Sequence, residues 1–285
     1  TADFHQSESV GEHFKARKFI TGFSGSAGTA VITKTEARLW TDGRYFIQAA
    51  KQLEESTVEL MKMGEPGVPE MNAYIEKVLQ AGETLGFDGR VVSVGEGQGY
   101  ADIAAKKDAH VNYQEDLIDE IWSDRPAMSE EPAFDLDVKY AGETVADKLE
   151  RIRKEMKDAG ANTHVMTTLD DICWTLNIRG NDIDFFPMVL SYAIVTMDGV
   201  ELYIDERKLD DALKVKLAAD GVKLHPYNDI YEDVKKFAED TVVMVDPGKL
   251  NYAIFNNIPE NVKTIEQRNP AILMKAMKNP VEIKN

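Results

Sequence analysis

The chain has 285 residues, of which 43% are hydrophobic and 8% are aromatic, a composition typical of a globular protein with an adequate core. Its 33 basic and 50 acidic residues give a formal net charge of −17, which argues against nucleic acid and anionic membrane surfaces as partners. No apolar run approaches the ~20 residues of a membrane-spanning helix, and we expect a cytoplasmic protein. A prior of about 150 residues per domain predicts two domains.

The first half of the chain predicts a β-hairpin followed by alternating helices and strands. In order, we expect a hairpin at 30–44, helices at 45–53 and 70–80, a strand at 84–87, a helix at 99–107 and an apolar helical face at 117–122. Residues 123–132 are rich in turn formers and mark a boundary between domains.

The second half opens with a helix and a strand and then follows the same order. We expect a helix at 143–159, a strand at 163–168, a helix at 170–176, a hairpin at 193–207, helices at 209–218 and 230–238, and a last strand pair and helix within 241–277. This pattern predicts an α/β fold with two tandem mixed sheets, each flanked by helices. The expected domains are 1–124 and 141–278, with a linker at 125–140 and the start of a further linker at 279–285.

The two halves are copies of one domain. Residues 30–44 return as residues 193–207, an offset of 163 at both ends (193 − 30 and 207 − 44). A period this long indicates a duplicated domain, because solenoid repeats recur every ~20–50 residues.

Further matches extend the repeat downstream, where Leu85–Asp88 answers Val243–Asp246 and Val111–Tyr113 answers Val262–Thr264. The helix and strand at 143–168 have no counterpart in the first copy. We expect that piece to fall before Thr1, with roughly 25 residues absent on this alignment. Loss of these elements from the first copy is the alternative, although removing a strand leaves backbone groups without partners.

Three features of the sequence could be taken for a binding or catalytic site. The Gly-rich stretch 22–29 lacks the Gly-Lys-Ser/Thr end of a phosphate-binding loop, which favours a tight turn. Cys173 lies in an apolar run and is expected to act as a small buried hydrophobe. The cluster of His and Glu between His5 and His13 can be drawn as a metal site, but these two residues are more than two helical turns apart. An exposed acidic helix is the preferred interpretation.

Two loops carry Arg and Asp residues in a pattern that suggests a specific role, at Asp42–Arg44 and at Arg179–Asp182. An Arg–Asp pair holding a hairpin end is one interpretation, and a contact to a neighbouring domain or peptide is the other. Arg44, Arg179 and Asp182 are therefore candidate substrate-access or interdomain contacts. We find no nucleophile triad or Cys-x-x-Cys pair, so the chain alone predicts neither a catalytic residue nor a metal ligand.

Three stretches together resemble the long, three-domain form of Xaa-Pro aminopeptidase (aminopeptidase P). They are residues 5–8 with 19–30, residues 39–52, and residues 169–180 with 191–193. The resemblance covers essentially the whole chain and implies two creatinase-like N-terminal domains. Residues 275–279 sit where the family passes into its catalytic domain.

The resemblance also implies an activity for the parent protein. That family removes the N-terminal residue from peptides with proline in second position, using two divalent metal ions, usually manganese, in a C-terminal domain. We therefore expect this chain to hold no cofactor and to be inactive alone. Its two domains are expected to support a homodimer and to restrict access of the peptide substrate.

Two other functions are compatible with the same domains. A freestanding peptide-binding or dimerisation module would carry both domains with no enzyme attached. Creatinase-type hydrolysis of small guanidino compounds is disfavoured, because that relative carries one N-terminal domain whereas the internal repeat predicts two.

Overall fold

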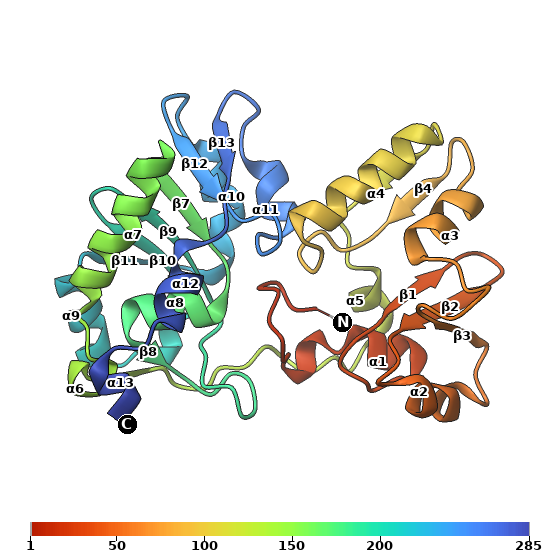
Figure 1. Ribbon diagram of the computed structural model, residues 1–285, viewed down its shortest axis with the longest axis horizontal. Helices are drawn as coiled ribbons and strands as arrows, with labels where there is room; N and C mark the ends of the chain where they lie inside the picture. Colours follow the sequence, from red (N-terminus) through yellow and green to blue (C-terminus); the bar gives the residue numbers. More distant parts are fainter. Residues whose placement is uncertain (1, 285) are drawn as a thin grey trace.

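The computed structural model describes residues 2–284. The chain forms two α/β lobes side by side, one for each half of the sequence (Figure 1). No helix in the described range is long and apolar enough to cross a membrane.

The first lobe holds two small sheets. Its elements are η1 (Glu12–Phe14), α1 (Ala16–Thr21), β1 (Thr29–Ile32), β2 (Ala37–Thr41), α2 (Phe46–Leu53), β3 (Val58–Lys62), α3 (Met71–Val78), β4 (Thr84–Gly86), α4 (Val94–Lys106), β5 (His110–Asn112) and α5 (Leu117–Ile121). Strands β1, β2 and β3 form one sheet in that order, and β4 pairs with β5 in the other. The β1–β2 pair is antiparallel, and the β2–β3 and β4–β5 pairs are parallel.

The second lobe holds one six-stranded sheet, with the order β11-β10-β9-β7-β12-β13. Its elements are β6 (Phe134–Asp135), α6 (Val138–Ala141), α7 (Val145–Ala159), β7 (Thr163–Met166), α8 (Leu169–Leu176), β8 (Ile178–Arg179), β9 (Ser191–Thr196), β10 (Val200–Ile204), η2 (Glu206–Lys208), α9 (Asp211–Ala219), β11 (Val222–His225), η3 (Tyr227–Asp229), α10 (Ile230–Asp233), η4 (Val234–Lys236), β12 (Val242–Val245), α11 (Tyr252–Asn257), β13 (Lys263–Glu266), α12 (Pro270–Ala276) and α13 (Pro280–Lys284). The short strands β6 and β8 pair separately.

The two hairpins share one register, as the internal repeat predicts. Ala30 lies opposite Leu39 in the first lobe. Ala193 lies opposite Leu202 in the second lobe, at the same 163-residue offset. The predicted mixed α/β architecture in two copies is therefore confirmed.

One predicted alignment is wrong by two residues. Leu85 lies opposite Val111 in the first lobe, and Val243 lies opposite Thr264 in the second. Val111 therefore corresponds to Thr264 and not to Val262. The match of two valines was misleading because pairing between strands, rather than residue identity, decides which positions are equivalent.

The sheet of the second lobe is buried on both faces. Along β9, Ala193 and Val195 belong to a core cluster with α7, α8, α9 and α12. The alternate residues Tyr192 and Ile194 belong to a second cluster with α10 and α11. This alternation follows from the two-residue period of a strand, and it requires helices on both sides of the sheet.

Helix α7 forms as its sequence predicts. The Thr144 hydroxyl accepts a hydrogen bond from the Asp147 amide at its start, and Gly160 ends the helix with φ 79°. Its predicted apolar stripe is buried, at Val145, Leu149, Ile152 and Met156. Each such side chain stabilises the fold by about 1.5–3 kcal/mol.

Helix α4 begins at Val94, five residues before the predicted start at Gly99. A capping box explains the difference, since the Ser93 hydroxyl accepts from the Glu96 amide and the Glu96 carboxylate accepts from the Ser93 amide. These two bonds stabilise a first turn that holds two glycines and looks unfavourable by propensity. The Ser-x-x-Glu spacing was the signal that the prediction missed.

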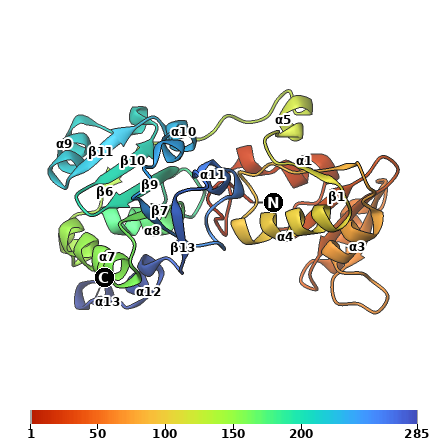
Figure 2. The same ribbon diagram turned by 90° about the horizontal axis from the view of Figure 1, so that it is seen from above.

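The start of α4 joins the two lobes, and Figure 2 shows it beside α11. The Val94 amide donates to the Leu250 carbonyl at 2.9 Å, and the Tyr252 amide donates to the Val92 carbonyl at 2.8 Å. At Gly97 a Cβ atom would lie 2.3 Å from the Tyr252 ring, so this position has no room for a side chain. The lobes are therefore held by main-chain bonds and close packing.

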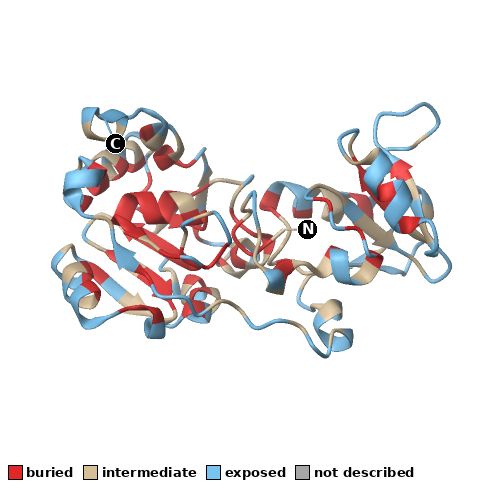
Figure 3. Cartoon of the chain, turned by 90° about the horizontal axis from the view of Figure 1, so that it is seen from below, coloured by how far each residue is buried: buried red, intermediate tan, exposed pale blue. Residues whose placement is uncertain are grey.

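Burial differs between the lobes (Figure 3). Strand β9 is buried along most of its length, whereas the equivalent β1 holds only exposed and half-buried residues. The hairpin of the first lobe is therefore less buried than the equivalent hairpin of the second lobe.

Candidate functional site

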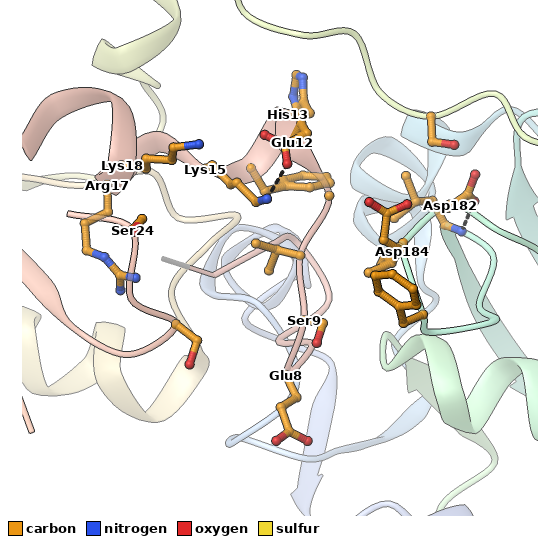
Figure 4. A pocket seen from close by; sticks show the side chains of 18 of the residues that line it. Glu8, Ser9, Glu12, His13, Lys15, Arg17, Lys18, Ser24, Asp182 and Asp184 are labelled. Carbon is orange, nitrogen blue, oxygen red and sulfur yellow. Dashed lines mark hydrogen bonds and ion pairs between the residues drawn. The ribbon is translucent and has the colours of Figure 1, made fainter. Parts of the chain in front are cut away.

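A cleft of about 770 Å³ lies between the two lobes (Figure 4). Its first wall is built by residues 8–18 and by the Gly-rich loop at 23–26, and its second wall by residues 181–185. Because the walls come from different lobes, their relative placement sets the width of the cleft.

The first wall carries both charges (Figure 4): the basic side chains are Lys15, Arg17 and Lys18, and the acidic ones are Glu8 and Glu12. Lys15 forms an ion pair with Glu12. Arg17 is buried, and its guanidinium donates to the carbonyls of Gly25 and Gly28 rather than to a carboxylate. Burial lowers the pKa of Arg17 to about 10. The cation therefore clamps the Gly-rich loop against α1.

The clamped loop is a tight turn, as expected. A Cβ atom at Gly25 would lie 2.2 Å from the Phe23 ring, and one at Gly28 would lie 2.7 Å from the Trp40 carbonyl oxygen. Backbone therefore approaches side chain and backbone too closely for any residue but glycine. The loop leads into β1 and not into a helix, so it offers no helix N-terminus to a phosphate group.

The second wall is acidic and is held by a buried ion pair. Asp182 accepts from the Lys208 ammonium and from the Leu190 amide, each at 2.6 Å. Both side chains of the ion pair are at most 2% exposed. Since a buried charge without its partner is strongly destabilising, the pair fixes the loop in place.

The tip of this loop carries an apolar side chain in solvent. Phe185 is fully exposed and has φ 62°, a conformation that bulky residues rarely adopt. The Phe186 amide donates to the Ile183 carbonyl at 3.1 Å and closes the turn. Asp184 and Phe185 both line the cleft.

The predicted exposed helix between His5 and His13 is wrong. Residues 5–11 form no helix, and His5 is fully buried against the second lobe. Its Nδ1 donates to the Thr167 carbonyl at 2.9 Å, and its Nε2 accepts from the Tyr227 hydroxyl at 2.6 Å. Burial lowers the pKa of His5, so the ring is neutral. Contacts with residues more than 150 positions away hold this segment, and local pattern could not reveal them.

The three candidate residues are not brought together. Arg44 is exposed and pairs with Asp42, with Nη2 and Oδ2 2.8 Å apart, as an ion pair holding the hairpin end. Arg179 donates to the carbonyls of Cys173 and Ile178 and not to Asp182. Only Asp182 lines the cleft between the lobes.

Sequence reasoning missed Lys208, Phe185 and the basic side chains of the first wall. Lys208 follows the repeated Asp-x-Arg motif, at the position where the first copy has Tyr45. That difference between otherwise equivalent residues was a usable signal. The basic side chains carry no local signal, because the fold alone places them opposite Asp182 and Asp184.

Within residues 2–284, no three His, Cys, Asp or Glu side chains are placed to hold a metal ion. His5 contacts Tyr227, whereas the Nδ1 atom of His13 lies 2.7 Å from the Pro126 carbonyl oxygen. The residues described here do not fit a metal centre. Cys173 is fully buried, as predicted, and burial raises the pKa of its thiol to about 12.

The creatinase/prolidase N-terminal domain family matches the chain twice, over residues 13–121 and over residues 124–282. The chain is similar to Aminopeptidase P2 of Arabidopsis thaliana, with 41% identity over 258 residues, 89% of this chain and 36% of that protein. It is 38% identical over 299 residues to the Probable Xaa-Pro aminopeptidase P of Coprinopsis cinerea, covering 99% of this chain and 47% of that protein.

Among solved structures, the chain is similar to the X-prolyl aminopeptidase of Caenorhabditis elegans, described as a cytosolic enzyme with a di-nuclear active site. The TM-score is 0.94 at 33% identity, and the match covers 99% of this chain and 47% of that one. This chain thus spans about half the length, or less, of the relatives it matches. The predicted resemblance is confirmed, and the chain corresponds to the N-terminal part of those proteins.

Proposed function

Because this chain belongs to the creatinase/prolidase N-terminal domain family, we propose that it is the non-catalytic N-terminal half of an Xaa-Pro aminopeptidase. The parent enzyme removes the N-terminal residue from peptides with proline in second position and acts in the cytoplasm. The observation that carries the proposal is the similarity of the whole chain to the first part of such proteins. On this proposal the domains are 1–124 and 141–278, the linker is 125–140, and 279–285 leads toward the catalytic domain.

Hydrolysis assays test the activity. The natural longer protein, supplied with Mn²⁺, should cleave a Gly-Pro-Ala peptide and leave Gly-Ala-Ala intact. Residues 1–285 alone should cleave neither, since two divalent ions, manganese on this proposal, would be held outside this chain. Failure of the longer protein to cleave Gly-Pro-Ala, or cleavage by residues 1–285 alone, would contradict the proposal.

We propose that the cleft between the lobes restricts which peptides reach the parent active site. A peptide carries both charges, and the cleft offers groups of both signs, with Lys18 and Glu8 on one wall and Asp184 on the other. Phe185 lines this cleft and is fully exposed there. These features suit a filter on peptide length.

The filter predicts a selective effect of Phe185→Ala in the longer protein. Its kcat/KM for a nonapeptide with proline second should rise at least threefold relative to that for Gly-Pro-Ala. Ile47→Ala is a matched control, because Ile47 is 89% exposed on α2 and does not line the cleft. An equal change in kcat/KM for both peptides would contradict the access role of the cleft. It would not contradict the assignment of the parent enzyme.

We also propose that the parent enzyme is a homodimer to which this chain contributes. Exposed apolar side chains surround the last helices of the second lobe, at Val138, Tyr140, Leu273, Met277 and Ile283. Helices α6 and α13 pack together there, and the Asn279 side chain donates to the Ala141 carbonyl at 2.8 Å. Exposed apolar groups in such proximity are typical of protein interfaces.

Light scattering after size exclusion tests the dimer. The longer protein should have twice its chain mass, and Leu273→Asp should shift it toward the monomer. Ile47→Asp, an exposed position in the other lobe, should leave the mass unchanged. A monomeric wild type would contradict the dimer.

A further inference from the structure

The helices α12 and α13 attach to the second lobe at different points (Figure 1). Helix α12 is anchored in the core, where Ala271 and Met274 belong to the cluster formed with α7 and α8. The Lys275 ammonium on the same helix forms ion pairs with Asp170 and with the buried Asp171. Helix α12 is therefore fixed relative to the six-stranded sheet.

Helix α13 has no such anchor in the core. Residues 277–279 separate it from α12, and none of its own residues, Pro280–Lys284, is buried. Met277 is 69% exposed and has an extended backbone, with φ −84° and ψ 91°. Because each residue has two soft backbone dihedrals, so short and exposed a connection could swivel. Another contact must therefore set the direction of α13.

The side chain of Asn279 supplies that contact by joining the ends of two helices. Its Nδ2 atom donates to the carbonyl of Ala141, the last residue of α6, at 2.8 Å. Its Oδ1 atom accepts from the amides of Val281 and Glu282, both at 2.9 Å, and so caps α13. The Glu282 carboxylate accepts from the Asn279 amide at 2.9 Å, which completes a capping box. One amide group thus ties the end of α6 to the start of α13.

Gly142 leaves the space that this joint needs. It ends α6 with φ 72°, and a Cβ atom there would lie 2.3 Å from Oδ1 of Asn279. Gly160 ends α7 with φ 79°, but nothing lies within 4 Å of its Cβ position. Both positions therefore need a left-handed backbone, and only Gly142 also needs the absence of a side chain.

The bond to α6 requires an amide side chain at position 279. Ala141 is 4% exposed, and its carbonyl carries the partial negative charge of a helix C-terminus. The amides of Val281 and Glu282 carry the partial positive charge of a helix N-terminus. An aspartate would cap α13 equally well but, as an ionised acceptor, could not donate to Ala141. The bond to α6 is therefore separable from the cap.

We propose that Asn279 is a positioning residue, which holds the catalytic half of the parent enzyme in one direction relative to the two lobes. This inference rests on the proposed function, in which a catalytic half follows α13. While Asn279 bonds to Ala141, the connection at residues 277–279 cannot swivel, and the cleft between the lobes keeps its place before the active site. Without that bond the lobes tilt away, and the restriction on long peptides is relaxed.

Asn279→Asp in the natural longer protein tests the joint, because it keeps the cap of α13 and removes the bond to Ala141. Its radius of gyration, measured by small-angle X-ray scattering, should exceed that of the wild type at equal molecular mass. Its kcat/KM for a nonapeptide with proline second should rise about threefold relative to that for Gly-Pro-Ala. Asn228→Asp adds the same charge at an exposed position of the second lobe and should change neither quantity.

Two glycine variants test the same joint from the side of α6. Gly142→Ala displaces the Asn279 side chain, whereas Gly160→Ala imposes the same left-handed backbone on an alanine in open space. Only Gly142→Ala should raise the radius of gyration and the ratio of the two kcat/KM values. Equal effects of the two variants would overturn the positioning role.

The proposed function and the positioning role can fail separately. Cleavage of Gly-Pro-Ala by the wild type tests the enzyme, and Phe185→Ala tests the filter. If both behave as expected, an unchanged radius of gyration or an unchanged kcat/KM ratio in Asn279→Asp would overturn the positioning role alone. If the wild type cleaves no such peptide, the positioning role falls with the proposed function.

Discussion

The two lobes carry the same hairpin in the same register, yet only one of them buries it. Ile32 in β1 is 56% exposed and Val195 in β9 is 1% exposed, although the repeat makes them equivalent. The local pattern of apolar and turn residues is sufficient to form a hairpin. Its burial depends on neighbours that come from elsewhere in the chain, here α7 and β7.

Breaking the buried ion pair of the second lobe should have the largest effect. Asp182→Ala leaves the Lys208 ammonium buried without its carboxylate, which should lower the free energy of unfolding by about 3–5 kcal/mol. Urea denaturation measures this change. The exposed pair of the first lobe is the control, since Asp42→Ala should cause no measurable loss. An equal loss in free energy of unfolding for Asp182→Ala and Asp42→Ala would contradict the difference between the buried and the exposed ion pair.

The next largest effect should come from truncating equivalent residues of β9 and β1. The loss in free energy of unfolding should be larger for the residue in β9. Val195→Ala removes buried methyl groups from a filled core and should lower the free energy of unfolding by about 2 kcal/mol. Ile32→Ala should change it by less than about 0.5 kcal/mol, as at other exposed positions. Urea denaturation of residues 1–285 is again the measurement. A larger loss at Ile32 would show that this side chain is covered.

Acid should weaken the second lobe. Burial lowers the pKa of His5 and of His164 below the ordinary value of 6.5, and both rings contact that lobe. Below pH 6.5 the unfolded state binds more protons than the folded state, so the free energy of unfolding falls as pH falls. The loss is up to about 1.4 kcal/mol per pH unit for each histidine.

Urea denaturation at pH 7.5 and at pH 5.5 measures this slope. His164→Gln should make the slope shallower. An unchanged slope in His164→Gln would show that the ring is protonated in the folded state.

Thiol reactivity should give the smallest signal. Burial raises the pKa of the Cys173 thiol to about 12, so a disulfide reagent at pH 8 should not label it in the folded protein. Labelling should begin only at urea concentrations that unfold the second lobe. Rapid labelling without urea would contradict the burial of this helix.

Much of the fold was predictable because it rests on local patterns. The α7 stripe and both hairpins follow from spacing alone. The early start of α4 was readable in its Ser93–Glu96 spacing. The burial of His5 was not, because its partners Thr167 and Tyr227 are distant in sequence. The same limit applies to the site, where Asp182 was a candidate but its partner Lys208 and the charged side chains of the first wall were not.

Urea unfolding followed at one tryptophan in each lobe tests the comparison most directly. Trp40 reports on the first lobe in Trp122→Phe/Trp174→Phe, and Trp174 reports on the second in Trp40→Phe/Trp122→Phe; both are buried. In residues 1–285, Trp40 should lose its native fluorescence at a lower urea concentration than Trp174, because its lobe has no strand between β1 and β4 in the described range. Coincident transitions, or an earlier loss at Trp174, would contradict the account.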